Sequence, residues 1–561
     1  MMKKQKLELT WIGKDEELKL EPRILIEDSK KSYGDPKAEN MLIHGDNLLA
    51  LKALEQDFAG KIKCIYIDPP YNTGNAFEHY DDNIEHSIWL NLMRPRIGNL
   101  QRLLSPEGFF CCQIDDSEGP YLKVLLDELF GRKNYITTFY IQVRYGNKTL
   151  AEDNDYQKLI EQCFIYAKDA NRCIANKDTE EYKIEKFEWE ITEKGKGEVL
   201  DLGRKKVELF KPNSYEIRKV AHSVKGLKET WATGSLIKQK ASSGEFLAKY
   251  LAPRKEIDGL GCLYKVYGIG EDGLGYRYFT GPKRADATKG KFYSGVPLQR
   301  VAEIQKGNTK KEIPIANFYD LAANFGNCRS EGSVDFRGGK KPEKLIEIVL
   351  NHFSNPNDWI LDSFLGSGTT AAVAHKLNRK WIGIELGVHA NTHCIPRLKS
   401  VVDGSDQSGI SKAVEWKGGG GFKFYELAPS LLRKDKYGNW VIDEKYNANM
   451  LAAAMCKHEG FIFFPDVEIY WKQGKSTESD YIFVTTAFMT VEQLDKIHSE
   501  MKKGESLLIC AKSFAPQCKE RHSNITIKKI PQMVLGKCEF GKNNYDLNIV
   551  NTSKNDDEDS E

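Results

Sequence analysis

The tetrapeptide Asp68-Pro69-Pro70-Tyr71 follows a short apolar segment, Cys64–Ile67, and its residue types suit chemistry on the exocyclic amino group of adenine. That nitrogen is a poor nucleophile because its lone pair is delocalised into the ring. Two hydrogen-bond acceptors can make it more tetrahedral: the Asp68 carboxylate and the Pro69 carbonyl, which two prolines hold rigidly. Tyr71 offers an aromatic face for stacking. Methylation there would depend on positioning and charge orientation. The alternative is a rigid strand-to-turn element without chemistry.

A glycine-rich turn, FLGSGTT at residues 364–370, lies between an expected strand, Trp359–Asp362, and an expected helix, Thr369–Leu377. Glycines at a strand-to-helix turn allow close approach of a ligand, and the helix start presents free N–H groups. A dinucleotide, a phosphate or S-adenosylmethionine would suit such a turn. The absence of a lysine before Thr369 disfavours a phosphate-binding loop, and the third glycine of the dinucleotide fingerprint is absent. Glu385 ends the next strand, and its carboxylate could accept hydrogen bonds from ribose hydroxyls. The alternative is a tight turn followed by a surface glutamate without a ligand.

The elements around both motifs alternate between strands and helices. Before and after the first motif we expect strands at Met41–His44, Cys64–Ile67 and Phe109–Ile114, and helices at Asp46–Gln56, Ile88–Leu104 and Tyr121–Phe130. Around the second we expect a helix at Lys344–His352 and a strand at Trp381–Glu385. This alternation predicts a doubly wound α/β fold with a mostly parallel sheet. Both motifs would then lie at the carboxyl ends of parallel strands, where ligands bind in open sheets.

Length and composition restrict the remaining possibilities. The 561 residues exceed one ordinary core, so several domains are expected. No run of about 18 apolar residues predicts a membrane span, and the N-terminal residues lack the apolar segment of a signal peptide. The twelve cysteines form no Cys-x-x-Cys pair, which favours reduced cytosolic thiols over disulfides or zinc. No histidine spacing indicates a metal site, so we expect none.

Charge is distributed unevenly although the net charge is only +2. Residues 201–300 hold 20 Lys and Arg against 10 Asp and Glu, and helical periodicity is lost from about 141 to 335. Within this region the segment 264–300 interleaves basic and aromatic side chains. A solvated face is the alternative to a nucleic-acid contact. The last eleven residues are acidic and predict a disordered tail.

The chain resembles amino-directed DNA methyltransferases of the beta arrangement, in which DPPY precedes the S-adenosylmethionine motif and a target-recognition region lies between them. It resembles in particular the modification subunits of type III restriction-modification systems, over residues 1–430. The similar stretches are LTWIGK (9–14), MLIHGDNLLALKAL (41–54), IDPPYNTG (67–74), YRYFTGPKRADATKGKFYSGVP (276–297), NFGNCRSEGSVDFRGGKKPEKLI (324–346) and GGGGFKFYEL (418–427).

The resemblance implies a seven-stranded Rossmann-like methyltransferase sheet of permuted order with five segments. These are an N-terminal extension (1–35), the catalytic half of the core (36–140), the target-recognition region (141–335), the cofactor-binding half (336–425) and a small C-terminal α/β domain (426–561). The glycine run at 417–421 predicts a linker before the last domain. That domain carries no catalytic motif, and the resemblance implies contacts with a second copy or with a restriction subunit.

The resemblance also assigns roles to individual residues. Asp68, Pro69, Pro70 and Tyr71 would hold a flipped adenine, because a base inside a duplex cannot reach them. The S-adenosylmethionine site would comprise Phe364, Gly366, Gly368 and Thr369 at its methionine end, Glu385 at its ribose, Asp46 near its adenine, and Lys341 in the segment that closes over it. From the basic segment we expect DNA contacts by Arg277, Lys283, Arg284, Lys289 and Lys291.

The function expected is methyl transfer from S-adenosylmethionine to adenine N6 at a specific site in double-stranded DNA, in the cytoplasm. The expected partners are a second copy of the chain and a helicase-nuclease restriction subunit. Cytosine N4 in DNA, or RNA, is an alternative substrate of the same reaction class, although Asp at position 68 favours adenine. A catalytically silent DNA-specificity subunit is the non-enzymatic alternative, and two intact motifs argue against it.

Overall fold

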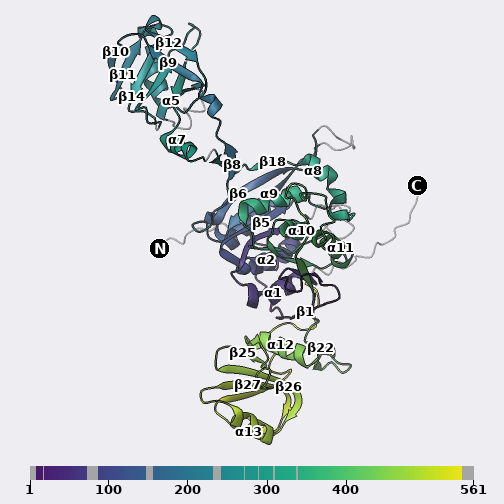
Figure 1. Ribbon diagram of the computed structural model, residues 1–561. Coiled ribbons are helices and arrows are strands. Elements are labelled where there is room, and N and C mark those ends of the chain that lie inside the picture. The colour runs from purple at the N-terminus through teal and green to yellow at the C-terminus, as the bar shows by residue number, and fades with distance from the viewer. Residues whose placement is uncertain are drawn as a thin grey trace, which may run out of the picture. The chain divides into compact units, whose positions relative to one another are not determined.

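The computed structural model describes residues 8–16, 18–71, 86–146, 156–231, 242–270, 272–287, 290–307, 310–336 and 339–545. The chain divides into two compact units. The first unit comprises Met1–Asn176 and Ala316–Glu561, and the second comprises Lys177–Ile315 (Figure 1). Among the described residues, no helix has the length and apolar character needed to cross a bilayer.

An eleven-stranded sheet forms the centre of the first unit. Ten strands follow one another in the order β1-β21-β3-β20-β19-β4-β5-β7-β6-β18, and β2 pairs with β21. From β21 to β5 neighbouring strands are parallel, and β7 is antiparallel to both β5 and β6. The strands are β1 (Leu25–Glu27), β2 (Tyr33–Gly34), β3 (Met41–His44), β4 (Ile62–Ile67), β5 (Leu104–Ile114), β6 (Tyr135–Gln142), β7 (Ile160–Ala167), β18 (Phe318–Asp320), β19 (Trp359–Asp362), β20 (Lys380–Glu385) and β21 (Gly421–Leu427).

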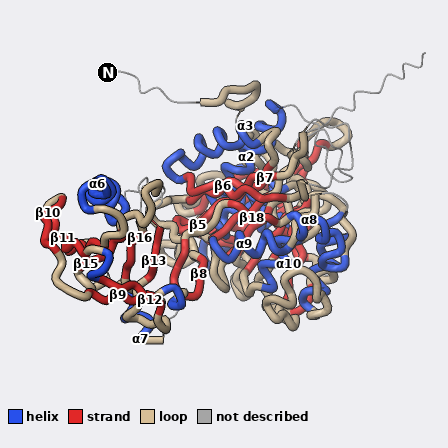
Figure 2. Tube along the Cα trace, turned by 90° about the horizontal axis from the view of Figure 1, so that it is seen from above, coloured by secondary structure: helices blue, strands red, loops and turns tan. Residues whose placement is uncertain are grey.

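Helices cover both faces of this sheet, so the expected doubly wound α/β class is confirmed (Figure 2). On one face, Leu51 and Trp89 join a core with Ile65 and Phe110 of the central strands. On the other face, Phe353 packs against Phe109 with ring centroids 4.8 Å apart. The first face is covered by α1 (Asn47–Phe58), α2 (His86–Leu103) and α3 (Gly119–Leu126), and the second by α8 (Ala322–Asn327), α9 (Glu343–Phe353), α10 (Thr369–Lys376) and α11 (Ile395–Val402).

The sheet has more strands than the seven expected, because additional strands extend it on both sides. β1, β2 and β21 lie beyond β3, and β18 lies beyond β6. The glycine run at 417–421 does not separate domains, since Gly421 begins β21, which is parallel to β3. Glycines at 418, 419 and 420 have positive φ angles of 93°, 115° and 75°, which explains their type in this turn into an edge strand.

The strand order reverses between β19 and β4, and this position determines where the two motifs lie. β19 and β4 are parallel neighbours, with Ile360 opposite Cys64 and Leu361 opposite Ile65. β20 lies on the far side of β19, whereas β5 lies on the far side of β4. DPPY follows β4 and FLGSGTT follows β19, so both motifs leave the same edge of the sheet at a topological switch point.

A six-stranded antiparallel sheet forms the core of the second unit, in the order β10-β11-β14-β15-β16-β13. Short helices, including α7 (Leu298–Gln305), and two small two-stranded sheets flank it. The strands of the larger sheet are β10 (Glu198–Leu202), β11 (Lys205–Phe210), β13 (Lys228–Trp231), β14 (Leu263–Tyr267), β15 (Tyr276–Thr280) and β16 (Lys291–Ser294). The smaller sheets pair β9 (Trp189–Glu193) with β12 (Tyr215–Lys219) and β8 (Asp178–Glu181) with β17 (Lys310–Ile313).

The C-terminal residues of the first unit carry a further five-stranded sheet, β24-β25-β26-β27-β28. Strands β26, β27 and β28 are parallel, and α13 begins at Val491 with Thr490 as its N-cap. The elements are β22 (Leu432–Lys434), β23 (Trp440–Ile442), α12 (Ala448–Glu459), β24 (Ile462–Phe463), β25 (Gly474–Lys475), β26 (Asp480–Met489), α13 (Val491–Glu500), β27 (Ser506–Phe514) and β28 (Ile525–Lys529).

The second unit, Lys177–Ile315, spans fewer residues than the target-recognition region expected at 141–335. Residues 141–176 and 316–335 belong to the first unit, where they contribute β7 and β18 to the main sheet. The buried face of β7 provides the reason, since Cys163, Ile165 and Ala167 are fully buried beside β5.

Candidate active site

A cavity of about 720 Å³ lies at the carboxyl ends of β4 and β19, and both motifs line it. Its volume is within the usual range for small-molecule sites. Asp68, Pro69, Pro70 and Tyr71 form one wall. The glycine-rich turn contributes Phe364, Leu365, Gly366, Ser367, Thr369 and Thr370, and further lining residues include Glu161, Phe336, Lys340, Lys341 and Asp362.

Hydrogen bonds fix the turn that carries Asp68. The Trp89 indole N–H of α2 donates to the Pro70 carbonyl oxygen at 2.7 Å. The Tyr71 hydroxyl donates to Asp68 Oδ1 at 2.6 Å and lies 3.0 Å from Glu161 Oε2. Tyr71 is therefore tied to two carboxylates. Its burial, together with the Asp68 carboxylate, raises the pKa of its hydroxyl well above the ordinary value.

Lys341 contributes the cation of this cluster. Its Nζ lies 2.9 Å from Asp68 Oδ2, 3.5 Å from Glu161 Oε2 and 4.7 Å from the centre of the Tyr71 ring. Burial raises the pKa of Asp68, and the Lys341 ammonium opposes that effect. Burial alone would lower the pKa of Lys341, but the Asp68 and Glu161 carboxylates outweigh it and raise the pKa. One ammonium thus serves two carboxylates at the wall of the cavity.

The neighbouring lysine has a different role. Lys340 Nζ donates to the carbonyl oxygens of Arg329, Glu331 and Val334 at 3.0, 2.6 and 2.7 Å. Burial lowers the pKa of Lys340 to about 8. Its three donors are used in holding the turn at 328–334, so Lys341 is the residue of this segment that reaches Asp68.

The glycine-rich turn adopts a conformation that requires its glycines. Gly366 and Gly368 have φ angles of 57° and 82°, a region that other residues adopt at a cost. Gly368 is the N-cap of α10, behind the lining residues. Arg397 Nη1 donates to Thr369 Oγ1 at 2.8 Å and reaches the Ser367 carbonyl oxygen at 3.4 Å. The buried Arg397 guanidinium thus fixes the position of the turn.

Two of the expected cofactor residues have other partners. Glu385 ends β20 and accepts hydrogen bonds from the N–H groups of Gly366 and Gly387 at 2.7 and 2.9 Å, and His389 Nε2 lies 2.7 Å away. Asp46 caps α1 through Leu49 N–H at 2.9 Å and accepts from Tyr545 N–H at 3.0 Å. Neither side chain is among the residues that line the cavity, although β3 and β20 are adjacent strands.

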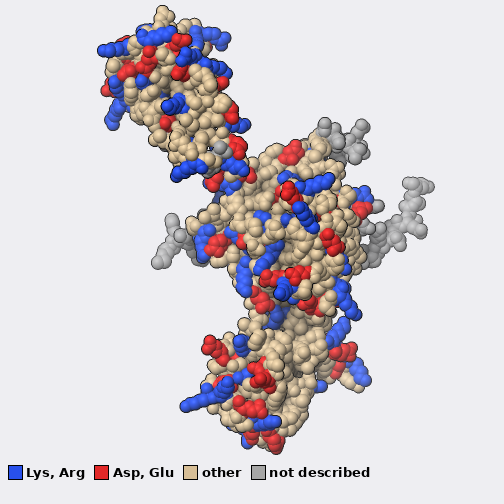
Figure 3. All heavy atoms as spheres, viewed as in Figure 1, with Lys and Arg blue, Asp and Glu red and all other residues tan. Residues whose placement is uncertain are grey.

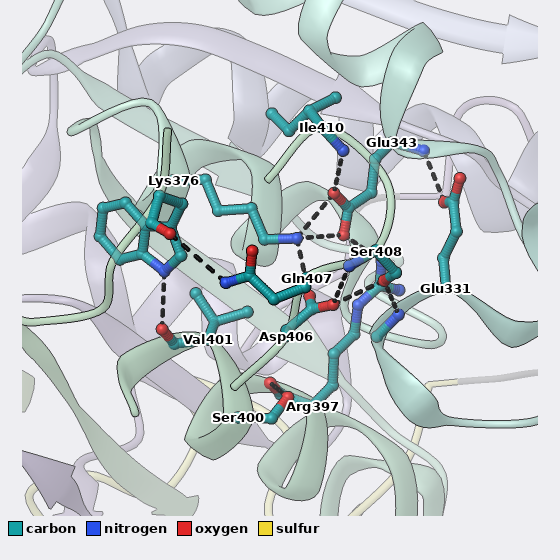
Figure 4. A network of polar contacts seen from close by, with 12 residues as sticks. Glu331, Glu343, Lys376, Arg397, Ser400, Val401, Asp406, Gln407, Ser408 and Ile410 are labelled. Carbon is teal, nitrogen blue, oxygen red and sulfur yellow. Dashed lines mark hydrogen bonds and ion pairs between the residues drawn. The ribbon is translucent and has the colours of Figure 1, made fainter. Parts of the chain in front are cut away.

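A buried network of four ionised side chains supports the turn (Figure 4). Lys376 Nζ lies 2.9 and 2.8 Å from the two Glu343 oxygens and 2.7 Å from Asp406 Oδ2. Arg397 Nη2 lies 2.8 Å from Glu343 Oε1. Glu343 begins α9 two residues after Lys341, and Arg397 contacts the turn at Thr369. The network therefore links the segment that carries Lys341 to the glycine-rich turn.

Asp362 lines the cavity, and the sequence motifs did not predict a role for it. It ends β19 and accepts hydrogen bonds from Phe364 N–H at 2.9 Å and from the Thr370 hydroxyl at 2.6 Å. These bonds fold the start of the turn back onto the strand. Burial raises the pKa of Asp362 from 3.8 to about 7, against the effect of both hydrogen bonds.

This shift predicts a pH-dependent stability difference for Asp362→Asn. An acid with a raised pKa in the folded state loses stability as pH rises from its unfolded pKa to its folded one. Wild type should therefore lose stability relative to the variant as pH rises from 4 to about 7. Above that range the difference in unfolding free energy between the two proteins should be constant. Each pKa unit corresponds to about 1.4 kcal/mol. Calorimetry of both proteins from pH 4.5 to 8, without cofactor, measures the gap in Tm, and a pH-independent gap would contradict the assignment.

The residues expected to contact DNA differ in accessibility. Lys283 and Arg284 are exposed, and Arg284 is only 3.5 Å from an equally exposed Asp286. Arg277 is mostly buried, contacting Ser243 and lying 3.6 Å from Asp272, and Lys291 pairs with Glu229 at 2.6 Å. Lys289 lies outside the described residues. On the face drawn in Figure 3, basic side chains project from this unit with acidic ones among them.

The aromatic side chains of the same segment form part of a core. Tyr278, Phe279 and Tyr293 are 5%, 0% and 3% exposed. The Tyr278 hydroxyl donates to Glu193 and the Tyr293 hydroxyl to Glu229, both at 2.5 Å. These rings hold the six-stranded sheet together, and they do not offer a free stacking surface.

Fold, motif order and cavity together define the class of protein: an α/β protein with an amino-group motif and a glycine-rich turn facing one small-molecule site. A family model described as DNA methylase matches residues 62–391, more than half of the chain, and the chain belongs to this family. Relatives with curated names include a probable type III restriction-modification enzyme HindVI Mod subunit from Haemophilus influenzae. It is 33% identical over 72% of this chain and 56% of its own length.

A second Mod-subunit relative agrees with this assignment. The type III restriction-modification enzyme EcoPI Mod subunit from Escherichia phage P1 is 25% identical over 68% of this chain and 62% of its own length. The chain thus spans about three fifths of the length of these relatives, and its resemblance to Mod subunits is confirmed. A putative DNA modification methylase from Thermus thermophilus, solved with S-adenosyl-L-methionine, is 12% identical, covers 69% of this chain and 100% of its own, and has a TM-score of 0.30.

Proposed function

We propose that this protein transfers a methyl group from S-adenosylmethionine to the N6 atom of adenine at a specific site in double-stranded DNA. The observation that carries the proposal is the shared cavity, which both Asp68 and Gly366 line although 298 residues separate them in sequence. Family membership supports the reaction class. The Mod-subunit relatives support the placement within a type III restriction-modification system.

The cavity suits the cofactor in size. It is lined by an aromatic ring, Phe364, by a close-approach turn at Gly366, and by the carboxylate of Asp68. S-adenosylmethionine supplies, when bound, a methyl group on a positively charged sulfur. A carboxylate at the wall favours that charge, and Gly366 allows the backbone to approach the ligand. Glu385 accepts a hydrogen bond from the Gly366 N–H. We propose that its carboxylate also binds the ribose hydroxyls of the cofactor.

The residues after β4 would act on the target amino group by orientation. Asp68 and the Pro69 carbonyl accept its two N–H bonds and direct its lone pair toward the glycine-rich turn. The bond from Trp89 to the Pro70 carbonyl keeps that backbone fixed. Tyr71 stacks on the base while its hydroxyl stays tied to carboxylates. The proton leaves after the nitrogen becomes cationic, so no strong base is needed.

Adenine is the substrate that we propose, with cytosine N4 as the second candidate. An ionised Asp68 can accept hydrogen bonds with both oxygens, and Asp at this position favours adenine, whereas cytosine-directed enzymes more often carry Ser. The Mod-subunit relatives support the adenine assignment. A base inside a duplex cannot enter the cavity, so base flipping forms part of the proposal.

We further propose that the chain works in the cytoplasm, where bacterial DNA lies, as a homodimer that docks a restriction subunit. The Mod-subunit relatives, which are named as subunits of restriction-modification enzymes, support the docking of a restriction subunit. Within the second unit, the exposed Lys283 and Arg284 are the best candidates for phosphate contacts. Arg277 and Lys291 would instead position strands β15 and β16, through Asp272 and Glu229 respectively.

Sequencing of host DNA tests the proposal as a whole. A bacterial host that expresses the chain should carry modified adenine at one short sequence, detected by methylation-sensitive long-read sequencing. The same host with the Asp68→Ala variant should carry none. Modification of cytosine would support the second candidate, and unmodified DNA from a host with folded protein would overturn the proposed activity.

A further inference from the structure

Glu161 is a carboxylate of the candidate active site that belongs to neither motif. It lies at the start of β7, an antiparallel strand that is next to β5 and two strands from β4. Its Oε2 accepts from the Gln113 side-chain amide, and lies 3.0 Å from the Tyr71 hydroxyl oxygen and 3.5 Å from Lys341 Nζ. Gln113 is itself fixed by the Tyr66 hydroxyl at 2.5 Å. A buried chain of polar groups therefore holds Glu161 against the catalytic turn.

Both oxygens of Asp68 have partners in this arrangement. Oδ1 accepts from the Tyr71 hydroxyl at 2.6 Å, and Oδ2 lies 2.9 Å from the Lys341 ammonium. An adenine amino group needs one of these oxygens as an acceptor. The ammonium is the more important partner to remove, because its positive charge offsets the negative charge with which Asp68 polarises the amino group, whereas the Tyr71 hydroxyl is neutral. Movement of Lys341 away from Asp68 would therefore make Asp68 a stronger acceptor for the proposed reaction.

Glu161 provides the position to which Lys341 can move. Lys341 already lies 3.5 Å from Glu161, so a small rotation of a flexible side chain would transfer the ammonium. A buried ammonium without a carboxylate partner would be costly. The Tyr71 hydroxyl lies within hydrogen-bond distance of both carboxylates, so it can donate its proton to either one.

We propose that Glu161 is a positioning residue that draws the Lys341 ammonium away from Asp68 when cofactor and target base bind. This inference rests on the proposed function. The positive charge of the bound cofactor favours this movement, since it repels the Lys341 ammonium from Asp68 while Asp68 stays ionised. The unliganded pairing of Lys341 with Asp68 then keeps the catalytic carboxylate charged and compensated until substrates arrive.

A double-mutant cycle measures this role. Glu161→Gln keeps the shape of the side chain but removes the charge that attracts Lys341, so kcat at saturating DNA and cofactor should fall roughly 10-fold or more. Adding Lys341→Met to Glu161→Gln removes the obstructing ammonium, so kcat should rise again. Glu161→Asp should retain more activity than Glu161→Gln. A merely structural Glu161 predicts the opposite for the double variant, with kcat equal to or below that of Glu161→Gln.

A structural readout keeps this test separate from the proposed function. In crystals of wild type with target DNA and sinefungin, a non-reactive cofactor analogue with a cationic amine, Lys341 Nζ should lie within hydrogen-bond distance of Glu161 and away from Asp68. In Glu161→Gln it should remain on Asp68. An ammonium still on Asp68 in the liganded wild type would overturn the inference. Wild type that binds sinefungin but methylates no DNA would overturn the proposed function and leave this readout intact.

A matched control removes a carboxylate from the same sheet without touching the cavity. Glu107 lies near the amino end of β5, is 44% exposed and pairs with Arg172 at the surface. Glu107→Gln should leave kcat within about twofold of wild type, because exposed ion pairs contribute little. Circular dichroism and thermal melting of all variants confirm folding. Wild-type kcat in folded Glu161→Gln would refute the positioning role directly.

Discussion

Asp68→Ala should abolish methyl transfer while the protein still folds and binds cofactor. Loss of one preorganised hydrogen-bonding group typically lowers kcat by about 10²–10³-fold, and loss of the charged acceptor of the reacting amino group should have at least this effect. Folding should survive because Lys341 retains Glu161 as a partner, 3.5 Å away. Transfer of labelled methyl groups to DNA measures activity, and calorimetric titration with sinefungin measures cofactor binding.

Asp116→Ala is the control for this experiment. Asp116 follows β5 at the same edge of the sheet, but its side chain is 65% exposed and pairs with the exposed Lys158. Its removal should leave activity near that of wild type. Retention of more than about a tenth of the activity in Asp68→Ala would show that Asp68 does not orient the reacting nitrogen.

Lys376→Met should cause the largest loss of stability of any single change considered. The variant leaves Glu343 and Asp406 buried without the ammonium that lies 2.7–2.9 Å from both. Breaking a buried ion pair by removing one partner costs about 3–5 kcal/mol. Differential scanning calorimetry should show Tm of the core transition lower by roughly 6–20 °C. The glycine-rich turn should also loosen, because Arg397 holds Thr369 and shares Glu343 with Lys376.

Lys344→Met provides the comparison on a nearby helix. Lys344 of α9 is 50% exposed and pairs with Glu347 one turn later. Exposed pairs of this kind contribute about 0.3–0.5 kcal/mol, so Tm should change by no more than about 2 °C. Equal Tm losses in the two variants would mean that the buried network contributes no more than a surface pair.

The fold class and the pairing of the two motifs could be predicted because local patterns determine both. The apolar strands at Cys64–Ile67 and Trp359–Asp362 end at the motifs, and parallel strands place their carboxyl ends at one edge. The structure places these strands side by side, with Leu361 opposite Ile65. The extra edge strands could not be foreseen: β21 follows a glycine run that is typical of linkers, and β18 has only three residues.

The cluster around Asp68 could be predicted only in part. Asp362 ends the strand before the glycine-rich turn, and that position was available from the sequence as a candidate. Glu161 could not be found in the same way, because it lies 93 residues from Asp68 in sequence and no motif surrounds it. Its proximity depends on β7 running antiparallel beside β5. Glu385 ends β20 as expected and Asp46 follows the neighbouring strand β3 by two residues, but their carboxylates bind backbone N–H groups of the protein.

The most direct test of the central claim follows a labelled methyl group from cofactor to base. DNA containing the target sequence is incubated with the protein and S-adenosylmethionine bearing a deuterated methyl group, then digested to nucleosides and analysed by mass spectrometry. The account predicts deuterated N6-methyladenine with wild type and none with Asp68→Ala. Label on cytosine N4, or equal label on adenine with the Asp68→Ala variant, would contradict it.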